Sequence, residues 1–167
     1  MPGIDPCGYA ERNGRLPLAF GDVTPQWLTS VLQNQYPGAV INGFTLLARI
    51  PGHTTKARYL LERNQMAIDA GIPAQVCLNA NWTGDPLSSE VCVNEARFFR
   101  LLRNTLELPA PVCFIADWDD DATGKQGLIM LEDLIPQGGQ FGTSGQSLSV
   151  DEVAASLEQL ARLHANT

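Results

Sequence analysis

The sequence lacks long apolar runs and is poor in basic residues. None of its apolar stretches approaches the roughly 18 residues that a membrane span requires, and its first 20 residues contain no apolar core of a signal peptide. The chain has 11 basic and 18 acidic residues, a formal net charge of −7. Because broad nucleic-acid binding requires a basic face, we expect no nucleic-acid partner. From the lack of long apolar stretches and of a signal peptide, we expect no membrane span and a cytoplasmic location.

Metal ligands and disulfide partners are also scarce. The two histidines, His53 and His164, stand far apart in the sequence, and no two cysteines form a CxxC pair. We interpret the four cysteines as free thiols, with disulfides or a zinc site as the alternatives. They are Cys7, Cys77, Cys92 and Cys113. The acidic run at 119–121, followed by Gly124, predicts a solvated hairpin tip rather than a metal site.

The remaining composition is that of one folded domain. Hydrophobic residues make up 44% of the 167 residues and charged residues 17%, which argues against disorder of the whole chain. A chain of this length can bury a substantial core. Alternation of apolar and polar residues predicts five strands, at 40–50, 56–63, 75–82, 112–118 and 127–131. The turn at 51–55 joins the first two strands as a hairpin.

Helical spacing predicts three helices between these strands and after them. The first begins at Thr24-Pro25 and ends near Pro37. The second runs from about Ser88 or Ser89 to before Pro109, and the third follows a capping box at 149–152. We expect one face of the second helix to contain Val91, Glu95, Phe98 and Leu102, and one face of the third to contain Ala154, Leu157, Leu160, Ala161 and His164.

Four short sequence motifs, taken in their order along the chain, resemble those of a known family. They are Asn-Glu-Ala-Arg-Phe-Phe at 94–99, Leu-Pro-Ala-Pro at 108–111, Leu-Ile-Met-Leu-Glu-Asp-Leu at 128–134 and Leu-Ala-Arg-Leu-His-Ala at 160–165. Together they resemble the N-terminal part of the aminoglycoside phosphotransferase and choline kinase-like families, close to the ecdysteroid kinase-like branch. The resemblance implies an α+β fold: a protein kinase-like small lobe with a five-stranded antiparallel sheet and a packed helix.

The resemblance also implies a domain organisation. Residues 1–20 would form an irregular arm, 21–135 the small lobe, 136–148 a linker and 149–167 the first helix of a large lobe that the sequence does not contain. His164 resembles a histidine near the end of that helix, and we expect it to pack or hydrogen-bond rather than to act in catalysis.

Three segments would then form a nucleotide site. The hairpin turn would cover the triphosphate, the third strand would carry a residue that contacts the phosphates and pairs with a carboxylate on the next helix, and the segment after the fifth strand would contact adenine. On this strand the family has a lysine, whereas this chain has Asn79. The implied nucleotide-binding residues are Gly52, His53, Thr54, Thr55, Asn79, Glu95, Glu132, Asp133 and Leu134.

The resemblance implies ATP-dependent phosphorylation of a small-molecule hydroxyl, with ATP as cofactor and Mg²⁺ in the complete enzyme. The family's catalytic aspartate lies in a His-Gly-Asp-like loop of the large lobe, and no such word occurs in these 167 residues. No catalytic or metal-binding residue is therefore named, and the acceptor would bind through the missing lobe. We expect the chain to be inactive alone. The alternatives are a degenerate, non-catalytic nucleotide- or partner-binding module and an unrelated α+β ligand-binding domain.

Overall fold

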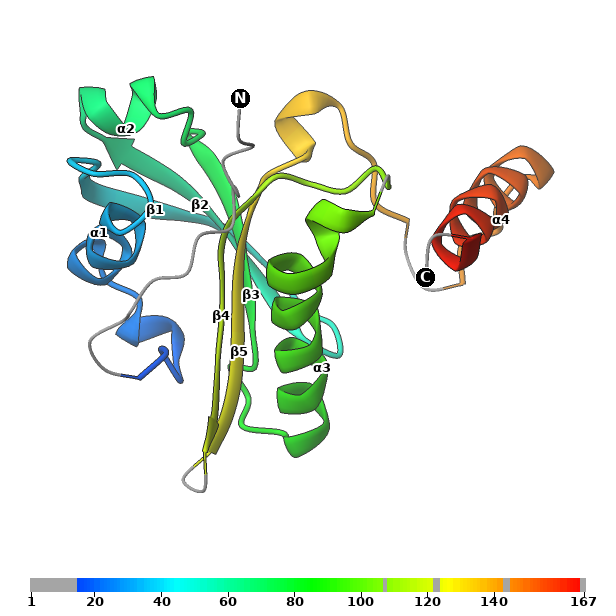
Figure 1. Ribbon diagram of the computed structural model, residues 1–167, viewed down its shortest axis with the longest axis horizontal. Helices are drawn as coiled ribbons and strands as arrows, with labels where there is room; N and C mark the ends of the chain where they lie inside the picture. The colour runs from blue at the N-terminus through cyan, green and yellow to red at the C-terminus, as the bar shows by residue number, and fades with distance from the viewer. Residues whose placement is uncertain (1–14, 107, 122–123, 143–144, 166–167) are drawn as a thin grey trace.

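The computed structural model describes residues 15–106, 108–121, 124–142 and 145–165. Its centre is a five-stranded sheet in the order β1-β2-β3-β5-β4, in which every neighbouring pair is antiparallel (Figure 1). The strands are β1 (Ile41–Ile50), β2 (Thr55–Arg63), β3 (Gln75–Ala80), β4 (Cys113–Asp121) and β5 (Gly124–Glu132). The expected α+β fold with a five-stranded antiparallel sheet is confirmed.

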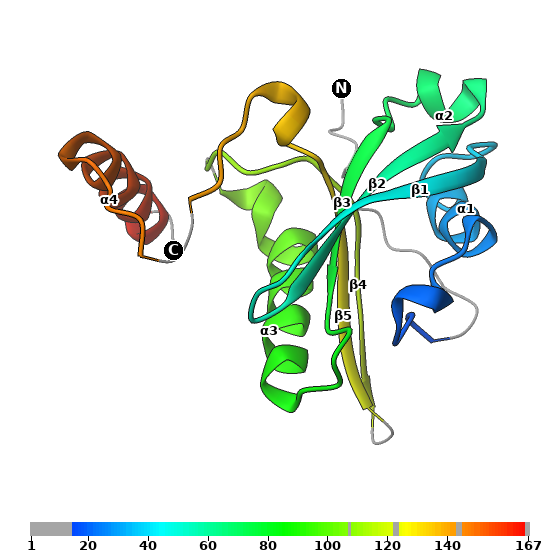
Figure 2. The same cartoon turned by 180° about the vertical axis from the view of Figure 1, so that it is seen from behind.

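The two faces of the sheet are covered by different helices. The longer helices are α1 (Pro25–Gln33), α3 (Pro86–Arg97) and α4 (Val150–Ala165), and α2 (Gln65–Asp69) is a single short turn after β2. A π-helical turn (Phe98–Leu102) and a 3-10 turn (Arg103–Thr105) continue α3, and further 3-10 turns occupy Phe20–Asp22 and Ile135–Gln137. Figures 1 and 2 show α1 and α3 on opposite sides of the sheet.

The first helix begins where the sequence predicts. The hydroxyl of Thr24 accepts a hydrogen bond from the Trp27 N–H at 3.1 Å. Pro25 stands at the first helical position, where an N–H group would have no acceptor within the helix. The apolar stripe of α1 packs on alternate residues of β2 and β3, which forms the larger core. This core includes Leu28, Val31, Leu32, Ala57, Tyr59, Leu61, Val76 and Leu78.

Only part of the predicted face of α3 lies against the sheet. Glu95 contacts Asn79 of β3, whereas Val91 is 41% exposed and Leu102, in the π-helical turn, is 51% exposed. The buried residues of α3 are mostly small: Ser88, Ser89, Cys92, Val93 and Ala96. The helix lies so close to β5 at Gly127 that a side chain there would overlap the backbone of Cys92 and Val93. Small residues allow this approach, and they carry no hydrophobic signal in the sequence.

The turn between β3 and α3 is held by the buried amide of Asn81. Its oxygen accepts hydrogen bonds from the Thr83 and Gly84 N–H groups, and its nitrogen donates to the Asp85 carbonyl at 2.7 Å. Asp85 then caps the helix by accepting from the Ser88 N–H at 2.7 Å. The helix therefore begins at Pro86, two or three residues before the predicted start at Ser88 or Ser89, and its position on the sheet is fixed at this end.

The three aspartates at 119–121 belong to β4 and not to the predicted polar turn. In the ladder, Asp119 is paired with Gln126 and Asp121 with Gly124. The carboxylate of Asp119 accepts a hydrogen bond from the Leu16 N–H at 2.8 Å. The predicted turn residues 122 and 123 lie outside the described residues.

The last helix lies apart from the sheet (Figures 1 and 2). It buries none of its residues, and of the face expected to be apolar Leu157 is 59% exposed and Leu160 is 46% exposed. His164 is exposed as well, and its expected packing or hydrogen-bonding role stays a prediction. Across the described residues, no helix has both the length and the apolar character needed to cross a membrane.

Candidate functional site

A cavity of about 280 Å³ lies where β5 ends and the chain leaves the sheet. Strands β1, β2, β3 and β5 form its floor, and the segment that follows β5 forms the opposite wall. Most of its surface is apolar. The lining residues are Ile50, Lys56, Arg58, Cys77, Pro111, Leu131, Glu132, Asp133, Leu134, Ile135, Phe141 and Gly142.

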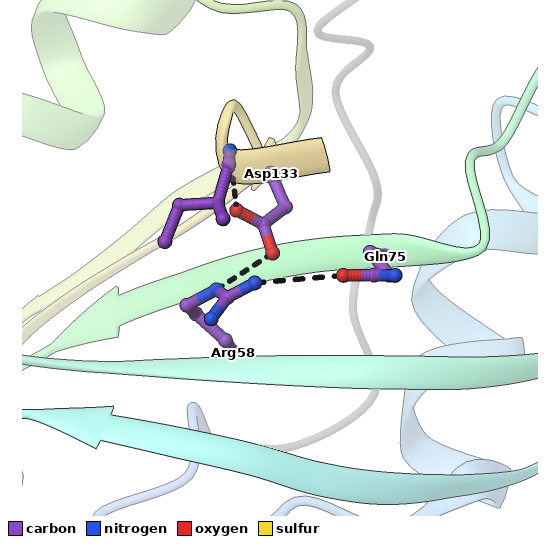
Figure 3. A network of polar contacts seen from close by, with 4 residues as sticks. Arg58, Gln75 and Asp133 are labelled. Carbon is purple, nitrogen blue, oxygen red and sulfur yellow. Dashed lines mark hydrogen bonds and ion pairs between the residues drawn. The ribbon is translucent and has the colours of Figure 1, made fainter. Parts of the chain in front are cut away.

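An ion pair fixes the wall of this cavity to the sheet. The Arg58 guanidinium on β2 donates a hydrogen bond from Nε to Asp133 Oδ2 at 2.7 Å. The same guanidinium lies 3.5 Å from Gln75 Oε1, and the other Asp133 oxygen accepts from the Ile135 N–H at 3.1 Å (Figure 3). Because Asp133 is 3% exposed and Arg58 16% exposed at their side chains, this contact is shielded from water. Arg58 therefore holds the segment after β5 in place.

The second polar pair is that of Asn79 and Glu95. Asn79 is buried on β3, on the face that α3 covers, and its amide nitrogen donates to Glu95 Oε2 at 2.5 Å. The expected proximity of these two side chains is confirmed. Lys56 stands directly opposite Asn79 in the ladder between β2 and β3, so the two side chains share one face of the sheet. These three residues form a polar cluster beside the cavity, which Lys56 also lines.

Burial sets the electrostatics of this cluster. It raises the pKa of Glu95 above the ordinary value of 4.5, while the hydrogen bond from Asn79 and the positive charge of Lys56 oppose the shift. A carboxyl whose pKa is higher in the folded protein binds its proton more tightly when folded. Stability that depends on Glu95 is therefore present at low pH and is lost as the pH rises from its unfolded pKa through its raised one.

Replacing Glu95 with glutamine is expected to remove this pH dependence. Glutamine keeps an oxygen that can accept from Asn79 and has no charge to desolvate. We expect Glu95→Gln to gain stability relative to the wild type as the pH rises from about 4 to about 7, measured by urea unfolding at each pH. Glu90→Gln, at an exposed position of the same helix, is the matched control. A Glu95→Gln difference that stays constant with pH contradicts the expectation.

The hairpin turn at 51–55 is attached to α3 and does not line the cavity. The Ser88 hydroxyl of α3 donates to the His53 carbonyl at 2.7 Å. Gly52 and His53 are exposed, whereas Thr54 is buried and its hydroxyl lies 3.5 Å from the Lys56 ammonium. The turn therefore lies at the end of the sheet that carries the N-terminus of α3.

The structure brings only some of the predicted residues to one place. Glu132, Asp133 and Leu134 line the cavity, and Asn79 and Glu95 form the polar pair beside it. The other four predicted residues do not line it: Gly52, His53, Thr54 and Thr55. Sequence reasoning missed the cavity residues on β2 and β3, which are Lys56, Arg58 and Cys77.

The available signal for these missed residues was strand alternation. Lys56 and Arg58 are two apart on one strand, and they stand opposite Asn79 and Cys77. Alternation alone places the two cations on one face, but it does not say which face or which neighbours. Phe141, in the segment after the sheet, had no such signal.

Among the described residues no group of three or more His, Cys, Asp or Glu side chains could hold a metal ion. In this region Asp133 is already paired with Arg58, and Asp117 is paired with Arg100 at 3.1 Å. Burial, together with the charge of Asp133, raises the pKa of the Cys77 thiol to about 11, so this thiol is protonated at neutral pH and is a poor nucleophile. The three cysteines that the structure describes are free thiols.

Comparison with known proteins identified no relative of the chain. No protein-family model, curated protein or solved structure matches the chain.

Proposed function

We propose that this chain binds ATP and forms the nucleotide-binding part of an ATP-dependent small-molecule O-phosphotransferase. The observation that carries the proposal is the position of the apolar cavity, between the sheet and the backbone of residues 132–134, next to the Asn79–Glu95 pair. Whole-ligand pockets measure roughly 300–1,000 Å³. A cavity of about 280 Å³ suits a flat base, with the sugar and the phosphates outside it.

The wall after β5 offers what an adenine ring requires. The Glu132 and Asp133 N–H groups already donate to the Val112 and Gln75 carbonyls, so the Leu134 N–H would be the donor to the edge of the base. Apolar side chains such as Leu131 and Phe141 can contact the faces of the base. The ion pair of Arg58 and Asp133 holds this backbone in position before a ligand arrives. A preformed wall lowers the entropy cost of binding.

The polar cluster lies on the side of the cavity that the phosphates would occupy. Lys56 is part of the cavity lining and stands opposite Asn79, with Glu95 beyond it. This arrangement supports a nucleotide whose phosphates extend toward the turn at 51–55. Magnesium would enter this proposal together with the phosphates of ATP.

A second candidate function is a non-catalytic nucleotide-binding module. Asn79 in place of a lysine favours it. Both candidates bind ATP, and in both cases the chain alone is expected to produce no ADP. An adjoining reading frame that encodes a lobe with a His-Gly-Asp motif and a later aspartate supports the phosphotransferase part, whereas ATP binding without such a lobe supports the module.

Filling the cavity is expected to abolish nucleotide binding. Cys77→Phe places a ring inside the lining, so ATP affinity measured by calorimetry is expected to fall at least about tenfold because the base no longer fits. Ser30→Phe is the matched control, since Ser30 lines a different cavity, beside α1. Failure of the wild type to bind both ATP and adenosine at millimolar concentration, or unchanged affinity in a folded Cys77→Phe variant, would overturn the proposal.

A further inference from the structure

The amide oxygen of Asn79 has no hydrogen-bond partner in the part of the chain that the structure describes. Asn79 is 3% exposed, so water does not easily supply one. A buried acceptor without a donor costs free energy, and such a group is uncommon in folded proteins. The nitrogen of the same amide is occupied by Glu95, which fixes the orientation of the oxygen. The oxygen therefore requires a donor from the cluster or from a ligand.

The donor that lies opposite Asn79 in the ladder between β2 and β3 is the ammonium group of Lys56. Lys56 is half-buried, and its backbone is the register partner of Asn79 between β2 and β3. Its Nζ atom lies 3.5 Å from the Thr54 hydroxyl oxygen. Its charge acts on Glu95, yet within the described ranges Lys56 forms no ion pair with a carboxylate. A neutral amide separates the two charges, so the charge of Lys56 remains available to an anion.

On the basis of the function proposed above, we propose that Lys56 supplies the cation that binds the phosphates of the nucleotide, and that Asn79 and Glu95 position it. Glu95 accepts from the Asn79 nitrogen and so presents the Asn79 oxygen to one ammonium hydrogen. An ammonium group has three donors, and the remaining ones are directed to phosphate oxygens. The positive charge thus comes from β2 rather than from β3.

The test compares ATP with adenosine, which has the base and no phosphate. In Lys56→Met we expect ATP affinity to fall roughly 10- to 100-fold, the range for loss of a charge-assisted hydrogen bond, and adenosine affinity to stay within about twofold. Lys125→Met is the matched control, because it removes one positive charge from an exposed pair with Glu90. It is expected to change neither affinity.

A charge-relocation variant completes the test. In Lys56→Met/Asn79→Lys the ammonium group returns to the cluster from the opposite strand, and we expect most of the ATP affinity to return. Equal ATP affinities for Lys56→Met and Lys125→Met, with adenosine still bound, overturn the role of Lys56 alone. Loss of both ligands in Lys56→Met that Asn79→Lys does not restore also overturns it. If the wild type binds neither ligand, the proposed function fails together with this inference.

Discussion

Gly127→Val is expected to lower the free energy of unfolding by about 3 kcal/mol or more, at or above the upper end of the usual cost of overpacking. A Cβ atom at Gly127 would overlap the Cys92 carbonyl group and the Val93 nitrogen. These are backbone atoms of α3, which cannot rotate away as a side chain can. Relief requires a shift of the whole helix from β5, and that shift also moves Glu95 away from Asn79.

Urea unfolding measures this effect, with Gly127→Ala expected to lie between the wild type and Gly127→Val. Gly21→Ala is the matched control, because a Cβ atom there meets nothing within 4 Å. Its effect on stability is expected to stay within about 0.5 kcal/mol, as is usual for surface positions. A Gly127→Val variant that unfolds at the wild-type urea concentration would show that α3 does not lie this close to β5.

The strands and the first helix are predictable from the sequence because their signals are local. Thr24-Pro25 marks a helix start through one hydrogen bond and one missing N–H, and the structure has both. The predicted face of Ala57, Tyr59 and Leu61 is likewise the buried face of β2. Each of these features depends on residues that are close in the chain.

The orientation of α3 is not predictable in this way because it depends on a distant residue. Gly127 comes about 35 positions after the middle of the helix, and it allows an approach at which small side chains suffice. Ser88 and Ser89 are buried because of this approach, although serine gives no hydrophobic signal. The larger Val91 and Leu102 attract attention in the sequence and yet face solvent.

In the candidate site, too, some contacts were predictable from the sequence and others depended on distant residues. The pairing of Asn79 with Glu95 was predictable from the resemblance, since it matches a pattern of a strand followed by a helix. The cavity residues Lys56 and Cys77 required the register between β2 and β3, which no local pattern encodes. The contribution of Arg58 required knowledge that the chain returns at Asp133, 75 residues later.

The ion pair between Arg58 and Asp133 is expected to give the second large effect. Removing one partner of a buried pair leaves the other charge without compensation, at a cost of about 3–5 kcal/mol. We expect Asp133→Ala to lower the free energy of unfolding by about 3 kcal/mol, at the lower end of that range because Arg58 is 16% exposed. The variant also removes the acceptor for the Ile135 N–H, so the wall of the cavity loses both of the side-chain contacts that Asp133 makes.

A double-mutant cycle measures the interaction free energy between Arg58 and Asp133 separately from the effect of each substitution. Arg58→Met keeps the apolar stem of the arginine, and we expect Arg58→Met/Asp133→Ala to be less destabilised than the sum of the two single variants by more than about 1 kcal/mol. Asp69→Ala is the matched control, since among the described residues its exposed carboxylate accepts a side-chain hydrogen bond from Gln65 alone, within α2. Additive effects in the cycle would mean that the two charges do not stabilise each other. The backbone at 132–134 would then be held by its hydrogen bonds alone, from the Glu132 N–H to the Val112 carbonyl and from the Asp133 N–H to the Gln75 carbonyl.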